Sequence, residues 1–216
     1  SQQNRILEGI AIPPKSIINC KGKKVLVIGG GDTGSDCVGT ANRHGAASVT
    51  QIEIMPQPPV GHNPATPWPM YPQVLKTSSS HEEGCIRRWN LASVRFIGDK
   101  NILKGVEVEE VEWLPAKDGG RTEMRKTGRT EVIEADLVFL AMGFIHPEQE
   151  GLVKELSLAV DTRGNIAVDP TTNQIAGTNI FASGDAVSGA SLVVRAMASG
   201  RKTAAAIDKY LYPHKS

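Results

Sequence analysis

A glycine-rich turn that follows a short aliphatic run constrains this chain more than any other feature. Residues 25–28 read Val-Leu-Val-Ile, and residues 29–34 read Gly-Gly-Gly-Asp-Thr-Gly, which fits the pattern Gly-x-Gly-x-x-Gly. An aliphatic strand that breaks into this pattern and continues into helix-compatible residues is typical of a dinucleotide-binding βαβ unit. The sequence therefore predicts a strand, a tight turn and the start of a helix here.

Each glycine of the turn has a physical role in that prediction. Gly29 lets the chain turn off the strand, Gly31 has no Cβ to hold a pyrophosphate away from the backbone, and Gly34 allows close helix packing. The helix start adds unpaired N–H groups and a positive dipole end. The candidate cofactor-binding residues of the turn are Gly29, Gly30, Gly31, Asp32, Thr33 and Gly34.

The residues after the turn complete the unit. We expect a helix over residues 36–44, a C-cap at Gly45 and a second strand over residues 48–55. Glu53 follows Gly34 by 53 − 34 = 19 positions. That is close to the offset of about 20 at which an acidic residue meets the ribose 2′-OH of a dinucleotide.

Composition narrows the class of partner and compartment. The 216 residues carry 24 Lys+Arg and 23 Asp+Glu, a formal net charge of +1, so neither nucleic acid nor membrane is an expected partner. Cys20, Cys37 and Cys85 are scattered singly, and without a Cys-x-x-Cys they cannot build a zinc knuckle or an iron–sulfur cluster alone. Scattered thiols favour a reducing, cytoplasmic compartment.

The flanking segments differ from the βαβ unit. Residues 1–20 contain Pro13-Pro14 and no periodicity, which predicts an extended linker, and the abrupt polar start suggests a piece of a longer protein. Residues 56–84 hold seven prolines up to Pro72, so they form a long loop. This loop is either a surface excursion over an apolar face or a lid beside the nucleotide, and the sequence favours neither.

Residues 87–143 return to strand patterns. We expect a short helix from Arg87, a third strand at 93–97, and an antiparallel meander. The meander strands are predicted at 105–113, 121–126 and 130–134. The apolar run at 136–142 predicts a parallel strand buried on both faces. The expected fold is α/β, a Rossmann-like parallel sheet with an antiparallel meander in its crossover.

Residues 144–216 have a different character. Strands are expected at 164–168 and 179–182, followed by a long helix over 189–211 that is rich in small residues. Small side chains along a helix favour close packing against a flat surface.

Four stretches, within 21–211, resemble the glutamate synthase small subunit family. They are residues 22–37, residues 55–59 with Asn63-Pro64 and Pro67-Trp68-Pro69, residues 135–144, and residues 180–201. The first and last stretches are also shared by dihydropyrimidine dehydrogenase and adrenodoxin reductase-like flavoproteins. The proline-rich stretch is shared by fewer families and points to glutamate synthase.

The resemblance implies an NAD(P)H domain at 21–143 and the C-terminal part of an FAD-binding domain at 144–216. Hydride would pass from NAD(P)H to FAD, and electrons would pass through iron–sulfur clusters to a large subunit that makes glutamate from glutamine and 2-oxoglutarate. By resemblance, Gly143, Gly184, Asp185, Ser191 and Leu192 are cofactor-binding residues, the last four toward FAD. A missing N-terminal part would carry the other FAD and iron–sulfur sites.

Cofactor choice depends on Glu53. NADPH-dependent members carry a basic pair just beyond the second strand, whereas here no Lys or Arg occurs between Glu53 and Lys76. A carboxylate accepts from a 2′-OH and repels a 2′-phosphate, which predicts a preference for NADH over NADPH.

Other readings stay open at this point. The chain could be a non-catalytic NAD(H)-sensing domain, or part of a dihydropyrimidine dehydrogenase-like or ferredoxin reductase-like enzyme. His44, His62 and His81 have no accompanying nucleophile motif and are interpreted as helix-end, loop or solvated residues. The basic run Arg121, Arg125, Lys126 and Arg129 lacks interleaved aromatic residues, which favours a solvated hairpin.

Overall fold

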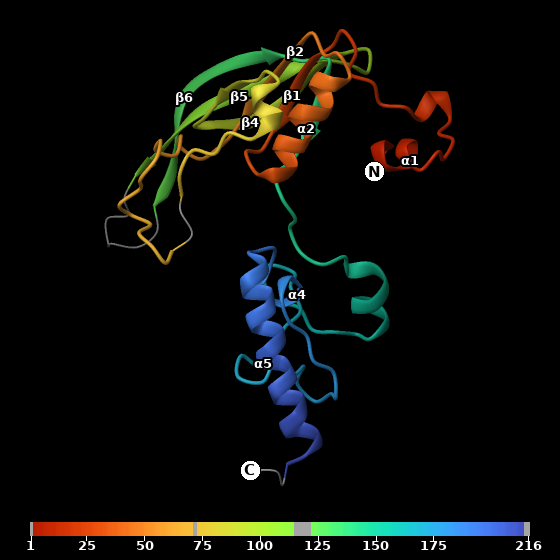
Figure 1. The fold of residues 1–216 in the computed structure, drawn as a ribbon, viewed down its shortest axis with the longest axis vertical. Coiled ribbons are helices and arrows are strands. Elements are labelled where there is room, and N and C mark those ends of the chain that lie inside the picture. The colour runs from red at the N-terminus through yellow and green to blue at the C-terminus, as the bar shows by residue number, and fades with distance from the viewer. Residues whose placement is uncertain (1, 71–72, 115–121, 214–216) are drawn as a thin grey trace. The chain divides into compact units, whose positions relative to one another are not determined.

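The computed structural model describes residues 2–70, 73–114 and 122–213. The chain divides into two compact units, Ser1–Met142 and Gly143–Ser216, and each is described by itself (Figure 1). Arg121 and the first part of the predicted strand at 121–126 lie outside the described residues.

The first unit is built on a four-stranded parallel sheet. Its strands are β1 (Lys24–Ile28), β2 (Ser48–Ile52), β3 (Ile86–Arg88) and β7 (Leu137–Leu140), in the order β3-β2-β1-β7. Every neighbouring pair is parallel. Helix α2 (Asp32–Arg43) connects β1 to β2, as the sequence predicts, and the Rossmann-like parallel sheet is confirmed.

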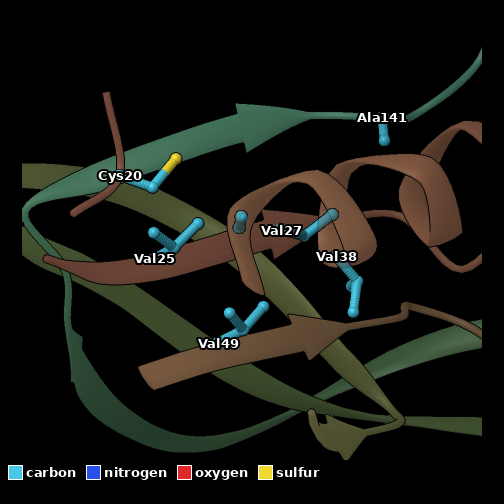
Figure 2. Close-up of a cluster of buried hydrophobic side chains, with 7 residues drawn as sticks. Cys20, Val25, Val27, Val38, Val49 and Ala141 are labelled. Atoms are coloured by element: carbon cyan, nitrogen blue, oxygen red, sulfur yellow. The ribbon is translucent and has the colours of Figure 1, made fainter. Parts of the chain in front are cut away.

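Helix α2 covers one face of this sheet. Figure 2 shows Val38 of α2 with Val25 and Val27 of β1 and Val49 of β2, and all four side chains are buried in one cluster. Gly45 follows the helix with φ +75°, a conformation that glycine adopts without steric cost, so the predicted C-terminal stop is confirmed.

An antiparallel sheet covers the other face. Strands β4 (Leu91–Asp99), β5 (Ile102–Leu114) and β6 (Glu123–Glu134) pair in the order β4-β5-β6. Leu26 and Ile28 of β1 pack with apolar residues of this sheet, including Val106 and Val108. Because side chains alternate along a strand, β1 uses Val25 and Val27 on the helix side and Leu26 and Ile28 on the sheet side.

Cross-strand ion pairs cover the solvent side of the meander. Arg125 pairs with Glu112 at 2.7 Å, Lys126 with Glu109 at 3.0 Å and Arg129 with Glu110 at 2.6 Å. The solvated hairpin predicted for this basic run is confirmed for these three residues, because a glutamate of β5 faces each cation.

Four sequence predictions for the first unit are wrong in detail. The two strands expected at 121–126 and 130–134 are one continuous strand, β6, from Glu123 to Glu134. Residues 86–88 form parallel strand β3 where a short helix was expected, and the helix lies earlier, as α3 (Ser79–Glu82). Residues 93–97 belong to the antiparallel sheet rather than to the parallel one. Strand β7 lies at the edge of its sheet, so Leu140 is 59% exposed instead of buried on both faces.

The N-terminal residues are also more regular than an extended linker. Gln2–Leu7 forms helix α1, and Pro14–Ser16 forms a 3₁₀ turn. Neither element buries a residue, so no apolar periodicity marks them in the sequence.

The second unit has a small core of its own. Helices α4 (Asp185–Ser188) and α5 (Val193–Leu211) follow one another, and Val153, Leu158, Ile166 and Ile175 form a buried cluster. The predicted strands at 164–168 and 179–182 are wrong: they appear only as isolated bridges, Val160 to Ile166 and Gln174 to Phe181. The predicted long helix is confirmed from Val193 onward.

Replacement of Gly29 by alanine should destabilise the first unit by at least about 2 kcal/mol, because φ is +123° and a Cβ would lie 2.1 Å from the Ala141 carbonyl oxygen. The matched control is Gly31→Ala, where φ is −79° and no atom lies within 4 Å of the added Cβ. The control should lose less than about 1 kcal/mol. Urea unfolding followed by tryptophan fluorescence reports on this unit alone, since Trp68, Trp89 and Trp113 all lie in it. Equal losses in both variants would contradict the prediction.

Candidate functional site

The glycine turn lies between the end of β1 and the first turn of α2. Gly29 and Gly34 are required by the protein's own packing, since a Cβ on Gly34 would lie 2.2 Å from the Gly29 carbonyl oxygen. Gly31, the N-cap of α2, faces open space instead. Asp32 and Thr33 are exposed in the first helical turn. The turn therefore has a tightly packed side and an accessible side, and the accessible side carries the N-terminal N–H groups of a 12-residue helix.

A pocket with a volume of about 640 Å³ opens beside this turn. Four segments of the first unit line it: the turn, the end of β2, the proline-rich segment and the end of β3. Its lining includes Gly30, Gly31, Asp32, Ser35, Gln51, Glu53, Pro58, Pro59, Asn63, Val74, Leu75, Ser78, His81, Arg87, Arg88 and Trp89. The volume lies within the range of small-molecule and cofactor pockets, about 300–1,000 Å³.

Glu53 directly follows β2 and turns its carboxylate toward the glycine turn. Its Oε2 accepts a hydrogen bond from the Gly30 N–H at 2.5 Å, and its Oε1 accepts one from the Ile54 N–H at 2.9 Å. The Glu53 carboxylate and the turn therefore form one surface of the pocket. The Glu53 side chain thus points toward the turn rather than into solvent.

The proline-rich segment lies against the same pocket. It contributes Pro58, Pro59 and Leu75 to the lining, and a backbone hydrogen bond of 2.9 Å from the Leu75 N–H to the Pro59 carbonyl joins its two arms. Trp68 and Val60 are 91% and 81% exposed, so this part of the segment does not cover an apolar face. Of the two readings of the segment, its position beside the glycine turn favours the lid.

Two basic residues that sequence reasoning missed reach this pocket from β3. Parallel pairing places Arg87 opposite Gln51 and Arg88 opposite Ile52. Both Arg88 terminal nitrogens donate to Glu131, at 3.0 and 2.5 Å. Arg87 stacks 5.2 Å from the Trp89 ring centroid and donates to the Lys76 carbonyl at 3.0 Å. The pair Arg87-Arg88 in the sequence could have indicated these two residues, but it was expected to lie in a short helix.

The candidate residues toward FAD lie in the second unit. Gly184 has φ +65° and donates its N–H to Ser199 Oγ at 3.1 Å, and a Cβ there would meet Ala196 at 3.4 Å. Asp185 begins α4, and Ser191 Oγ lies 3.5 Å from its Oδ1. The structure thus brings Asp185 and Ser191 together.

The other two candidate residues of this unit lie on either side of these three in the sequence. Leu192 is the N-cap of α5, and Gly143, with φ +86°, is the first residue of the unit. Within the described residues of this unit, no hydrogen bond links Gly143 to the other four.

The histidines and acidic residues do not build a metal centre in the described ranges, where no group of three His, Cys, Asp or Glu is suitably arranged. His44 caps α2 at its C-terminus and His62 is exposed in the proline-rich segment, as interpreted from the sequence. His81 is only partly exposed, because it packs in α3 against Gln51. Within the described residues, no helix is long and apolar enough to cross a membrane.

The Rossmann-like sheet and the glycine turn together define a dinucleotide-binding class of protein, and comparison with known families agrees with this class. Residues 7–200 match the family model of the pyridine nucleotide-disulphide oxidoreductases, so the chain belongs to that family. A solved structure of FprA from Mycobacterium tuberculosis in complex with NADPH has the same fold. It superimposes with a TM-score of 0.65 at 14% identity, covering 91% of this chain and 54% of that one.

Glutamate synthases are among the proteins with high sequence identity to this chain. The chain is 42% identical to the glutamate synthase [NADPH] small chain of Mycobacterium tuberculosis over 96% of its own length. It is 39% identical over 88% of its length to the glutamate synthase [NADH] of Saccharomyces cerevisiae. It spans 42% of the first relative and 9% of the second.

Proposed function

We propose that this chain is the dinucleotide-binding part of a glutamate synthase small subunit, with the C-terminal part of its FAD-binding domain attached. The observation that carries the proposal is the glycine turn: its one open glycine, Gly31, faces a pocket that the proline-rich segment also lines. The identity of 42% over 96% of the chain to a curated small chain supports it.

The residues of the turn fit a dinucleotide. Gly31 leaves room for a pyrophosphate, and the N–H groups at the start of α2 donate to it with the favourable end of the helix dipole. Glu53 accepts from the ribose 2′-OH and repels a 2′-phosphate, so NADH is the preferred cofactor. The nicotinamide, when bound, supplies a hydride to the FAD of the longer protein.

The rest of the proposal concerns that longer protein. Gly184, Asp185, Ser191 and Leu192 contribute to FAD binding, and Gly143 belongs to the same cofactor-binding set. A preceding N-terminal part supplies the remaining FAD and iron–sulfur sites, and the large subunit receives the electrons for glutamate synthesis. The same proposal includes a cytoplasmic location.

The decisive experiment uses the full-length protein that contains this chain, purified with a glutamate synthase large subunit. Oxidation of NADH that requires both glutamine and 2-oxoglutarate, with glutamate as product, is the expected result. NADH binding without turnover would instead favour the non-catalytic NAD(H)-sensing domain. Turnover with a pyrimidine or a ferredoxin, and none with 2-oxoglutarate, would favour the related reductases.

Glu53→Gln should shift the ratio of NADPH to NADH affinity by about tenfold toward NADPH, because the amide keeps the acceptor for Gly30 and removes the charge that repels a 2′-phosphate. Titration calorimetry of both cofactors on the 216-residue chain measures the ratio. Glu123→Gln, an exposed carboxylate at the start of β6 and outside the pocket, is the control and should leave the ratio unchanged. An unaltered ratio in Glu53→Gln would remove Glu53 from cofactor selection.

Gly31→Ala should weaken NADH binding by about tenfold or more while the urea midpoint stays close to that of the unchanged chain. The added methyl group contacts no protein atom and occupies the space through which the pyrophosphate reaches the backbone. Calorimetric titration beside an unfolding curve separates the two effects. Unchanged affinity would show that the phosphates do not approach at Gly31.

A further inference from the structure

A chain of hydrogen bonds joins the end of the proline-rich segment to the glycine turn. Gln51 Nε2 donates to the Gly29 carbonyl at 2.8 Å, and the Gln51 Oε1 lies 2.9 Å from His81 Nε2. Gln51 is 3% exposed, so its amide has little access to water as a substitute partner. The carbonyl that ends this chain belongs to the first glycine of the turn.

The other ring nitrogen of His81 extends the chain to helix α2. The Ser78 N–H donates to His81 Nδ1 at 3.2 Å, and Ser78 Oγ lies 2.9 Å from the same nitrogen. Ser78 Oγ is also hydrogen-bonded to Ser35 Oγ, in the first turn of α2. His81 thus connects to both sides of the turn, through Gln51 to Gly29 and through Ser78 to Ser35.

The groups at the two ends of this series of hydrogen bonds fix which atom donates in every bond around His81. The Gly29 carbonyl can only accept, so the Gln51 amide nitrogen faces it and the Gln51 oxygen faces His81. The Ser78 backbone N–H can only donate, so His81 Nδ1 must carry a lone pair. A neutral imidazole with its proton on Nε2 is the form that satisfies both contacts. Protonation would point an N–H at the Ser78 N–H.

The surroundings also disfavour an imidazolium. Burial, followed by the positive charge of Arg87 on β3, lowers the pKa of His81 below its ordinary value. Among the described residues, no carboxylate forms an ion pair with Arg87 that could neutralise it. The other charged groups on the elements around His81 are Asp32, Asp36 and Arg43 on α2, Glu53 after β2, Lys76 before α3, Glu82 and Glu83 at the end of α3, and Arg88 on β3.

We propose that His81 is a positioning residue for dinucleotide binding: as a neutral imidazole it holds Gly29 and Ser35 in place, and its protonation loosens the turn and weakens binding. This inference rests on the proposed function, because it concerns affinity at the same turn. In this proposal, the end of the proline-rich segment that contains α3 is held to the turn by hydrogen bonds and keeps the site in position. Binding should consequently weaken as the pH falls below about 6.5, the ordinary pKa of histidine.

The tautomer can be tested without any ligand. Nitrogen-15 NMR of histidine side chains in the 216-residue chain should show His81 with its proton on Nε2 at pH 7.5. It should also show a titration midpoint of His81 below about 6.5, the ordinary pKa of histidine. A proton on Nδ1, or a His81 midpoint at or above that value, would overturn the proposal.

The effect on binding is tested with NAD⁺, which is stable in acid. Affinity in the unchanged chain should fall between pH 7.5 and pH 5.5 by up to about fivefold, the loss of one hydrogen bond when His81 is fully protonated. His81→Asn keeps an acceptor for Ser78, but its side chain is too short to place a donor where Nε2 meets Gln51, so it should bind more weakly at pH 7.5 and lose this pH dependence. His62→Asn should behave as the unchanged chain.

The possible failures of this experiment are distinguishable. Binding at pH 7.5 with the same pH dependence in His81→Asn as in the unchanged chain overturns the role of His81 and leaves the proposed function standing. No binding of NAD⁺ or NADH by the unchanged chain at pH 7.5 removes the proposed function, and with it the role in binding.

Discussion

Burial of β1 on both of its faces is the constraint on which the first unit depends. Val25 and Val27 pack under α2, while Leu26 and Ile28 pack against the antiparallel sheet. A strand enclosed in this way reaches solvent only at its two ends, and the glycine turn begins at one of them. The close approach of Gly29 to the Ala141 carbonyl of the neighbouring chain segment leaves no room for a Cβ, so packing and turn conformation require the same residue.

The three glycines of the motif therefore have different physical reasons to be glycine. Gly29 and Gly34 are required by backbone contacts inside the protein, and a chain with this packing would need them even without a ligand. A Cβ on Gly31 would contact no protein atom, so the fold alone does not explain its lack of a side chain. An open glycine beside a pocket is the part of the motif that carries functional information.

The sequence predicts well what is local and poorly what depends on distant pairing. Strand β1, the turn, α2 and β2 are continuous in sequence, and their periodicity and glycines were sufficient to place them. Strand β3 follows a long proline-rich segment and has only three residues, so nothing local identifies it as a partner of β2. In the second unit, the residues expected as strands make only single bridges, and a short apolar run cannot show how many neighbours it will pair with.

The same limitation applies to the site. Glu53 was found because its offset from Gly34 is fixed by one βαβ unit. Arg87 and His81 reach the site only because the chain comes back to β2 after the proline-rich segment, where β3 pairs with β2 and His81 bonds Gln51. Positions paired in a parallel sheet share a face, so Arg87 and Gln51 both point to the side where Glu53 meets the turn. A carboxylate bound to the turn and a guanidinium stacked on Trp89 therefore line one pocket. If the turn binds a dinucleotide as proposed, the field at the ribose 2′-position is the sum of these two opposite charges, and the carboxylate that contacts the turn itself is the one that favours NADH.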